Sequence, residues 1–512
     1  MNTIYLAVVW HQHQPPYVAP RESAARMPWV RLHGIKDYIG MAMLAAEYPE
    51  FRHTINLTPS LVRQLQAYAD GDATDRALEL TQKRAEDLGE EEAEEILDGF
   101  FAANFDTMIS PHKHYRELYS RRELQEKTNG SALNEFTVDD LRDLQTWGTL
   151  TWFHPLVFRE NETLRELLKK GGGFTEEDKQ TVLKHQDDVL QRILPLHQQL
   201  QEQGVVELTT SPLYHPILPL LIDQQSARVA LPEVPLPTDS FDGRDDAAQQ
   251  VERALHIHEE QFGSRPAGMW PPEGSISPAA LSVMAEAGVE WVASDEEVLR
   301  RSLSANGRSS RDQAGPGWLY APYSAGAQGG DALNIVFRDH VLSDRIGFQY
   351  ASYQSGEEAA NDLINRIKQV GNAETRQPPL VSIILDGENP WEHYPRQGLE
   401  FLSPFYRKAC RDDAIQPVTV SEYVEQFGPV QELNHVHSGS WIGADFSTWI
   451  GDNEKNRAWE MLSRARSSAS PRSPRPTANP TSARSYRAVA LSSVENSLAS
   501  RSSVPTSSSR RM

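Results

Sequence analysis

The chain has 512 residues, 39% of them hydrophobic and 24% charged, and a formal net charge of -21. A chain of this length is too long to fold around one small hydrophobic core. We therefore expect one large barrel with an appendage, or two to three domains. The negative charge argues against nucleic acid and other phosphate-bearing partners, but it does not repel a neutral ligand.

The sequence also bears on the cellular compartment of the protein and on its contact with membranes. No run approaches the roughly 18 apolar residues of a membrane span, so we expect no membrane partner. Cys410 is the only cysteine, which rules out an internal disulfide. The first ten residues carry no charged leader of the kind that a signal peptide has. Together these observations predict a cytoplasmic protein.

Short apolar runs recur along the chain, and polar or proline-rich residues follow each of them. Short apolar runs of this kind are typical of the buried strands of a parallel sheet. Helical patterns separate the runs, which predicts an α/β fold, an incomplete (β/α)7 TIM-like barrel with helical insertions and a C-terminal helical region. We expect strands at residues 4–10, 51–57, 205–210, 289–295, 333–339 and 380–385, and one leading into Trp270.

Changes in composition divide the chain into three parts. Residues 1–400 are expected to form the catalytic barrel, with a charged helical insertion at about 73–203. Residues 401–466 are expected to be a truncated helical region that covers the cleft. Residues 467–512 are rich in Ser, Arg and Pro, with seven arginines against the single acid Glu495, and this predicts a disordered tail. A helical pattern breaks off there, so we hypothesise a reading-frame shift near codon 467.

An acid lies beside an aromatic ring in Trp270-Pro271-Pro272-Glu273. The prolines fix φ ahead of the acid, and Trp270 offers a flat apolar face of the kind that packs against a sugar ring. Retaining glycoside cleavage needs two carboxyl groups about 5–5.5 Å apart. Glu273 and Asp386 form the best pair, because each follows an expected buried strand. Asp344 and Glu388 compete for the same roles, and no spacing rule separates the candidates.

Histidines follow two of the expected strands. His11 and His13 are two residues apart, so they would share one face if the strand continued, and His215 follows the run at 205–210. Three interpretations stay open: bonding between loops, binding of sugar hydroxyls, and ligation of a divalent metal ion. Glu207 lies inside its apolar run, so it should be buried and needs a partner.

Five motifs in order across residues 4–465 resemble those of glycoside hydrolase family 57. These α-glucan-active enzymes have a (β/α)7 barrel. The resemblance implies that Glu273 is the nucleophile and Asp386 the general acid/base. Within the family, the segments 11–15 and 342–348 are more similar to the amylopullulanase/α-amylase type than to the branching enzymes. The motifs are His11–Pro15, Glu207–Ser211 with His215-Pro216, Trp270–Glu273, Leu385–Asn389, and Trp441–Trp459.

The function that this resemblance implies is retaining hydrolysis of α-glucans, such as starch, glycogen, maltooligosaccharides or pullulan, through a covalent glycosyl-enzyme. We expect no cofactor and no metal. Alternatives are a 4-α-glucanotransferase of the same family, a metal-dependent carbohydrate hydrolase or deacetylase using the His-x-His pair, and an inactive glucan-binding remnant. The preference for α-1,4 or α-1,6 bonds and the oligomeric state stay open. Predicted substrate contacts are His11, His13, Glu207, His215, Trp270, Asp344, Trp391, Trp441 and Asp445.

Overall fold

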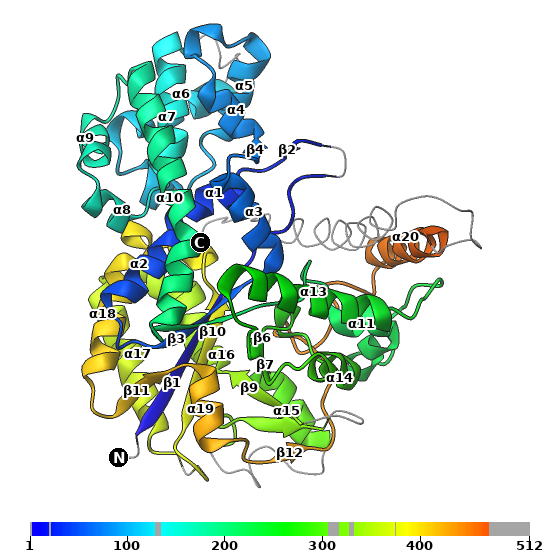
Figure 1. The fold of residues 1–512 in the computed structure, drawn as a ribbon. Helices are drawn as coiled ribbons and strands as arrows, with labels where there is room; N and C mark the ends of the chain where they lie inside the picture. The colour runs from blue at the N-terminus through cyan, green and yellow to red at the C-terminus, as the bar shows by residue number, and fades with distance from the viewer. Residues whose placement is uncertain are drawn as a thin grey trace.

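Seven parallel strands form the core of the protein (Figure 1). The computed structural model describes residues 3–19, 22–127, 135–305, 317–326, 332–373 and 375–469. The run that contains His11 is buried over its whole length, as its apolar sequence predicts. The seven strands are β1 (Ile4–Gln12), β3 (His53–Leu57), β5 (Val206–Thr209), β6 (Gly268–Met269), β7 (Trp291–Asp295), β9 (Leu333–Arg338) and β10 (Leu380–Asp386).

The seven strands follow one another in chain order around a ring. One sheet has the order β10-β1-β3-β5 and the other includes β9-β7-β6. A single parallel bridge between Thr210 and Met269 joins β5 to β6. At the other seam the Asp339 N–H donates to the Ser382 carbonyl at 2.8 Å, which joins β9 to β10. The α/β class and the seven-strand order are confirmed, although two sheets with narrow seams replace a continuously paired barrel.

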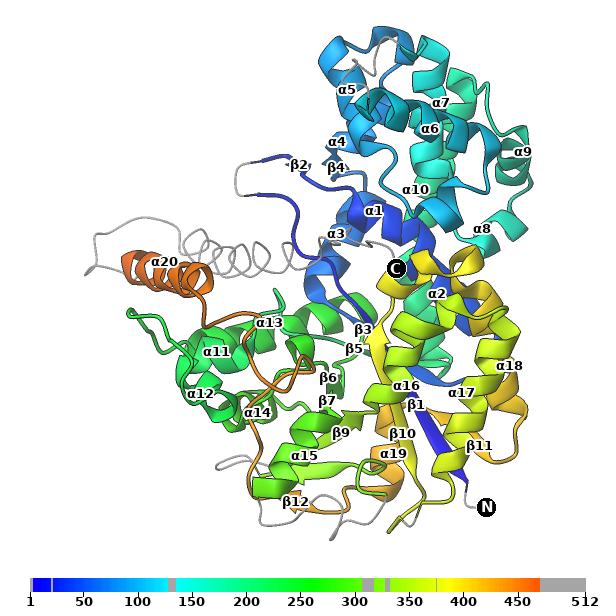
Figure 2. The same cartoon turned by 180° about the vertical axis from the view of Figure 1, so that it is seen from behind.

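Shorter strands extend both sheets, two others pair with each other in a separate two-stranded sheet, and helices cover the ring. Figure 2, seen from behind, shows α17 and α18 side by side. Helices separate the strands along the chain, as the alternating sequence pattern predicts. The added strands are β2 (Ala24–Ala25), β4 (Thr74–Asp75), β8 (Tyr323–Ala325), β11 (Ile415–Val418) and β12 (Glu432–Leu433); the covering helices are α1 (Trp29–His33), α2 (Ile39–Glu47), α3 (Pro59–Ala69), α11 (Leu218–Ile222), α12 (Ala227–Ala230), α13 (Arg244–Phe262), α14 (Pro278–Glu286), α15 (Glu296–Ala305), α16 (His340–Asp344), α17 (Gly356–Val370), α18 (Leu399–Arg411) and α19 (Val420–Phe427).

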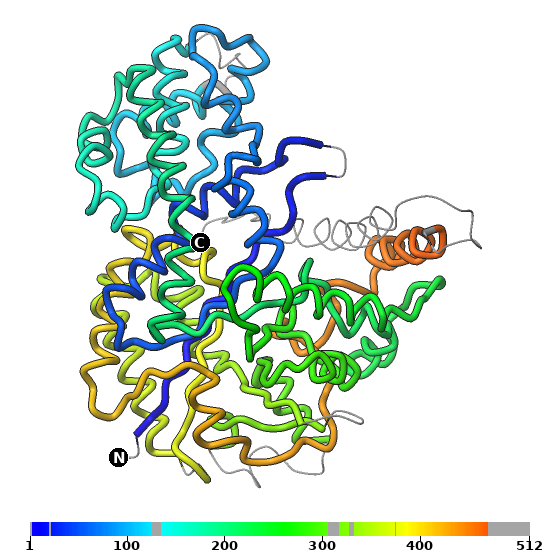
Figure 3. The backbone as a smooth tube through the Cα atoms, in the orientation of Figure 1, coloured from blue at the N-terminus to red at the C-terminus, as the bar shows by residue number. Residues whose placement is uncertain are grey.

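A helical lobe lies between β3 and β5, within the insertion expected at about 73–203. Figure 3 shows the chain leaving the ring, winding through the lobe and returning along α10. Thr175 caps α10: its Oγ1 accepts from the Asp178 N–H at 3.2 Å, while Asp178 accepts from the Thr175 N–H at 2.9 Å. The lobe helices are α4 (Arg76–Gln82), α5 (Glu90–Gly99), α6 (Lys113–Lys127), α7 (Val138–Leu150), α8 (Pro155–Glu160), α9 (Glu162–Lys170) and α10 (Glu176–Glu202).

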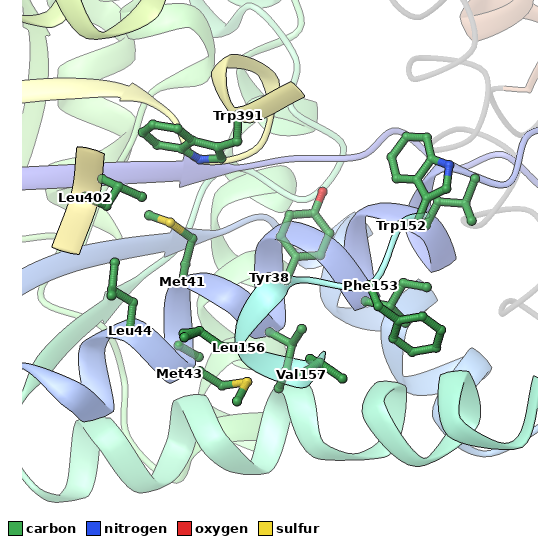
Figure 4. Close-up of a cluster of buried hydrophobic side chains, with 14 of the residues drawn as sticks. Tyr38, Met41, Met43, Leu44, Trp152, Phe153, Leu156, Val157, Trp391 and Leu402 are labelled. Carbon is green, nitrogen blue, oxygen red and sulfur yellow. The ribbon is translucent and has the colours of Figure 1, made fainter. Parts of the chain in front are cut away.

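Among the contacts that join the lobe to the ring, an apolar cluster and an ion pair are deeply buried. Figure 4 shows a buried cluster in which Leu156 lies with Tyr38, Met41 and Trp391. The second contact is an ion pair between Arg31 and Asp75, whose side chains are 2% and 0% exposed. Arg31 Nε donates to Asp75 at 2.8 Å and a second Arg31 nitrogen donates to it at 3.0 Å. The pair therefore connects α1 to the first element of the lobe.

The segment after α18 reaches back to the ring and then leaves it. Helix α20 (Asn453–Ala469) packs near α13, where Arg466 Nε donates to Asp246 at 2.6 Å. The tail from residue 470, with the expectation of disorder there, lies outside the described residues. Within the described part of the chain, no helix has the length and apolar character needed to cross a bilayer.

Removing the Asp75 carboxylate should destabilise the protein, because the Arg31 charge would stay buried without its partner. We expect Asp75→Ala to lower the free energy of unfolding by about 3–5 kcal/mol. Arg76→Ala is the control, since it breaks an exposed pair with Glu95 and should cost at most about 1 kcal/mol. Urea denaturation curves of the two variants check this, and equal losses would contradict it.

Candidate active site

Glu273 lies on a strained turn at the end of β6. Its backbone is left-handed, with φ 56° and ψ 28°, a conformation that non-glycine residues rarely adopt. Three neighbours hold it there: Pro272 fixes the preceding φ, the Trp441 N–H donates to the Glu273 carbonyl at 2.9 Å, and Ser294 Oγ donates to the Gly274 carbonyl at 2.7 Å. The turn therefore holds the Glu273 side chain in one direction.

The Glu273 carboxyl group is mostly buried and carries an unusual pKa. Burial raises the pKa of Glu273 to about 7, and the charge of Asp386 adds to the rise. The Trp441 indole N–H donates to Glu273 Oε2 at 2.7 Å and opposes that rise by favouring the carboxylate. Glu273 therefore changes its charge near neutral pH.

Asp386 ends strand β10 and faces the same cavity as Glu273. The register of β1 and β10 places Asp386 beside His11. Asn389 Nδ2 donates to Asp386 Oδ2 at 2.8 Å. A cavity of about 770 Å³ is lined by both carboxyl groups and by Trp441. The structure therefore brings together the two acids that the sequence pairs.

Asp344 and Glu388, the competing acids, have different surroundings. Asp344 lines the cavity but accepts from Arg338 at 2.5 Å and lies 2.8 Å from His340 Nε2. Glu388 is 3% exposed, and its Oε1 accepts from the His13 N–H at 3.1 Å. Burial raises the pKa of Glu388 well above its usual range. Asp344 thus sits in an ion-pair network, whereas Glu388 is buried and is not among the residues that line the cavity.

Arg338 and His340 also line the cavity, although the sequence analysis did not propose them. The Arg338 side chain donates to Asp295 at 3.3 Å and to the Ile384 carbonyl at 2.7 Å, and its guanidinium lies 5.5 Å from the centre of a Trp441 ring. A hydrogen bond to Asp295 raises the pKa of His340, against the effect of burial. Both follow the apolar run of β9, the same position that identified the other candidates.

His11, His13 and His215 form a stack beside the cavity acids. The ring centres of His13 and His215 are 4.1 Å apart and those of His11 and His215 are 4.9 Å apart. Burial lowers the pKa of all three, that of His13 to about 3, so the imidazoles are neutral at physiological pH. His215 adopts a left-handed φ of 58°, and its Nε2 lacks a partner among the described residues.

The orientation of the stack favours hydrogen bonding over metal binding. One ring nitrogen from each histidine lies within 4.8 Å of the others. However, lone pairs lie in the ring plane, so those of the stacked His13 and His215 run side by side, whereas zinc needs nitrogens converging at about 2.0–2.1 Å. Asn56 Nδ2 donates to Thr209 at 3.2 Å, which turns its Oδ1 toward His11 Nδ1 at 2.7 Å. His11 Nε2 is then left as an acceptor.

Comparisons with known proteins decide the family. The chain matches the profile of "Glycosyl hydrolase family 57" over residues 7–435. The chain belongs to this family. Its fold resembles that of the α-amylase AmyC from Thermotoga maritima, with TM-score 0.54, 16% identity and coverage of 98% of this chain and 94% of that chain. It also resembles a GH57-type branching enzyme from Pyrococcus horikoshii, with TM-score 0.53, 17% identity and coverage of 91% and 78%.

A sequence relative matches only locally. Alpha-amylase 1 of Dictyoglomus thermophilum is 28% identical over 97 residues, which is 19% of this chain. The match spans about a tenth of that relative's length, 11%. The two structural likenesses, at 16% and 17% identity, support the family 57 fold alone.

Three of the predicted substrate contacts lie away from the cavity lining. Glu207 is partly buried in β5 and does not line the cavity. It accepts hydrogen bonds from the Trp291 indole at 3.0 Å and from the Thr54 hydroxyl at 3.0 Å, which are the partners expected for a polar group in an apolar run. Trp391 is 1% exposed and donates to the Gly387 carbonyl at 2.8 Å. Asp445 accepts from the Ser447 N–H at 2.8 Å within its own loop. Their predicted contact with substrate stays a prediction.

The other predicted contacts lie in or beside the cavity. Asp344 and Trp441 line it directly. Trp270 is 1% exposed and packs edge-on to Trp441, with ring centres 5.1 Å apart, and it lies 5.8 Å from the His11 ring. Trp270 is therefore buried against the Trp441 and His11 rings, and its predicted contact with substrate stays a prediction.

The raised pKa of Glu273 predicts how stability depends on pH. Between pH 4.5 and about 7 the folded protein holds a proton at Glu273 that the unfolded chain has released, so stability falls as pH rises through this window. Glu273→Gln should therefore unfold less readily than the wild type at pH 8, by on the order of 1–3 kcal/mol, and nearly equally at pH 4. Urea denaturation at both pH values measures this. The exposed-site control Glu290→Gln should show no such trend, and a pH-independent offset for Glu273→Gln would contradict the prediction.

Proposed function

We propose that this protein cleaves α-glucans with retention of configuration, with Glu273 as the nucleophile and Asp386 as the general acid/base. The observation that carries the proposal is the meeting of these two carboxyl groups in one cavity from the ends of two strands. Family membership supports glycoside chemistry, and the name of the Dictyoglomus relative supports an α-glucan substrate. The net charge of -21 does not repel a neutral polysaccharide.

The raised pKa of Glu273 suits a retaining mechanism, because the site then holds a proton near neutral pH. One carboxylate must attack the anomeric carbon, and one carboxylic acid must protonate the leaving oxygen. Since burial and the charge of Asp386 raise the pKa of Glu273 to about 7, Glu273 holds a proton just below that pH. Substrate binding need only place that proton on Asp386, beside the leaving oxygen, and leave Glu273 charged.

The first step forms a bond between Glu273 and C1 of glucose while the C1–oxygen glycosidic bond breaks and the leaving oxygen takes the proton of Asp386. In the second step a hydroxyl oxygen attacks C1, its proton goes to Asp386, and the electron pair of the broken ester bond returns to Glu273. The Trp441 indole N–H, 2.7 Å from Glu273 Oε2, holds the carboxyl group in line for both steps.

The incoming hydroxyl decides between hydrolysis and transfer. Water gives an amylase or amylopullulanase activity, which we place first because of the similarity at residues 11–15 and 342–348 and because of the α-amylase relative. A sugar hydroxyl gives a 4-α-glucanotransferase, which is the alternative within the same mechanism. The neutral histidine stack offers His11 Nε2 as an acceptor for a substrate hydroxyl in either case.

The two catalytic roles can be told apart with azide. Alanine at either Glu273 or Asp386 should lower turnover of starch by at least roughly a thousand-fold, whereas the exposed Glu290→Ala should not. With maltosyl fluoride as donor, azide should replace the missing nucleophile in Glu273→Ala and give the β-azide. In Asp386→Ala it should attack the glycosyl-enzyme from the other face and give the α-azide. NMR of the products reads the configuration, and the same anomer from both variants would refute the assignment.

Chelation separates this proposal from a metal-dependent hydrolase or deacetylase that uses His11 and His13. We expect maltooligosaccharide cleavage to survive dialysis against EDTA at more than about half its rate, because neither carboxyl role needs a metal ion. The control is re-addition of zinc. Loss of activity in EDTA with recovery in zinc would favour the metal enzyme, and glucan binding without any product would favour the inactive remnant.

A further inference from the structure

Phe348 is the most exposed large hydrophobic residue of the described chain, with 82% of its surface accessible. It nonetheless lines the cavity that contains Glu273 and Asp386. Ile442, which is 42% exposed and follows Trp441, lines the same cavity. Two solvent-exposed apolar side chains thus line the same concave site as the two carboxyl groups, and a cavity with apolar lining and a few polar groups is typical of a ligand site.

The backbone that carries Phe348 is firmly held. The π-helix η7 (Arg345–Gln349) contains Phe348, and π-helical turns are frequent at functional sites. Ile346 and Tyr350, on either side, are 0% and 2% exposed. The Tyr394 hydroxyl donates to the Ile346 carbonyl at 2.5 Å. The exposed ring is therefore presented on a fixed support and does not belong to a loose surface loop.

The position of η7 relates Phe348 to one of the two carboxyl groups. η7 packs against η9 (Asn389–His393), the turn that follows Asp386 and carries Asn389, the hydrogen-bond donor to Asp386. A general acid/base faces the leaving group and, later, the incoming hydroxyl. Phe348 thus lies on the side of the cavity from which an acceptor would approach.

We propose that Phe348, with Ile442, forms an acceptor-side subsite that binds a second α-glucan chain. The flat ring stacks on the apolar C–H face of a glucose unit, as aromatic side chains do with flat apolar partners. The inference rests on the proposed function, because an acceptor has meaning only if Glu273 carries a glycosyl group.

Whether a glucose unit occupies this subsite determines how much of the glycosyl-enzyme reacts by transfer and how much by hydrolysis. When a glucose unit is stacked on Phe348, its hydroxyl oxygen forms the new bond to C1, its proton passes to Asp386, and the C1–Glu273 bond breaks with its electron pair returning to Glu273. When the subsite is empty, water makes the same attack and the chain is hydrolysed. Phe348 is a specificity-determining residue in this scheme, since it touches the acceptor sugar and takes no proton.

The test compares Phe348→Ala, Phe348→Tyr and the control Met461→Ala, which removes a 61%-exposed side chain on α20. Maltosyl fluoride is the donor, because fluoride leaves the acceptor side free, and maltose is the acceptor. Phe348→Ala should raise KM for maltose and lower the ratio of transfer to hydrolysis roughly three- to ten-fold. Phe348→Tyr and Met461→Ala should keep the wild-type values. An unchanged KM for maltose, or equal losses of transfer and hydrolysis, overturns the proposal.

A binding measurement keeps the outcome separate from that of the proposed function. In the Glu273→Gln background, calorimetry with maltoheptaose should show weaker binding when Phe348→Ala is added and recovery with Phe348→Tyr. If the wild type releases no fluoride, the proposed function fails, and the calorimetry still tests the subsite. Equal affinity with and without the Phe348 ring overturns the subsite. Matching thermal unfolding of all variants shows that the fold is intact.

Discussion

The paired hydrogen bonds between Trp441 and Glu273 are the interaction on which the site depends. The Trp441 backbone N–H holds the Glu273 carbonyl at 2.9 Å and its indole holds the carboxyl group at 2.7 Å. A left-handed glutamate costs about 1–3 kcal/mol, so it persists only where neighbours fix it. Trp441 also packs on Trp270 and lies beside the Arg338 guanidinium. The Trp441 side chain therefore contacts the Glu273 carboxyl group, the ring of Trp270 and the Arg338 guanidinium.

Parallel strands explain why so much of this arrangement was predictable. The carboxyl ends of parallel strands meet at one edge, so an acid just past a buried run points to the same place as the others. Glu273 and Asp386 obey this rule. Glu207 does not, because it lies inside β5, two residues before the strand ends, and it serves contacts among strands. Position relative to the strand end, more than membership of a motif, therefore separates cavity residues from core residues.

The residues that the sequence analysis missed depend on contacts between distant segments. Arg338 ends β9 as an acid or histidine ends other strands, but its importance lies in joining Asp295 to Asp344. No local pattern encodes that network. The ring shows the same limit. The strand order follows from the alternating runs, whereas each seam has few backbone contacts, such as the bridge from Thr210 to Met269, and β6 has only two residues.

The charge of the cavity limits what can bind in it. Glu273, Asp344 and Asp386 line it together with Arg338 and His340, and Asp344 is paired with both of these bases. The chain as a whole carries -21. An anionic substrate would meet the Asp386 carboxylate, whose hydrogen-bond partner is the neutral amide of Asn389, and that repulsion is costly at low dielectric. A neutral sugar avoids this cost and still supplies hydroxyls for uncharged imidazoles and apolar faces for exposed rings. Burial and the nearby Asp386 charge also raise the pKa of Glu273 to about 7, which keeps a proton in the site near neutral pH. The Asp386 charge that disfavours an anionic ligand is therefore also a charge that raises the pKa of Glu273.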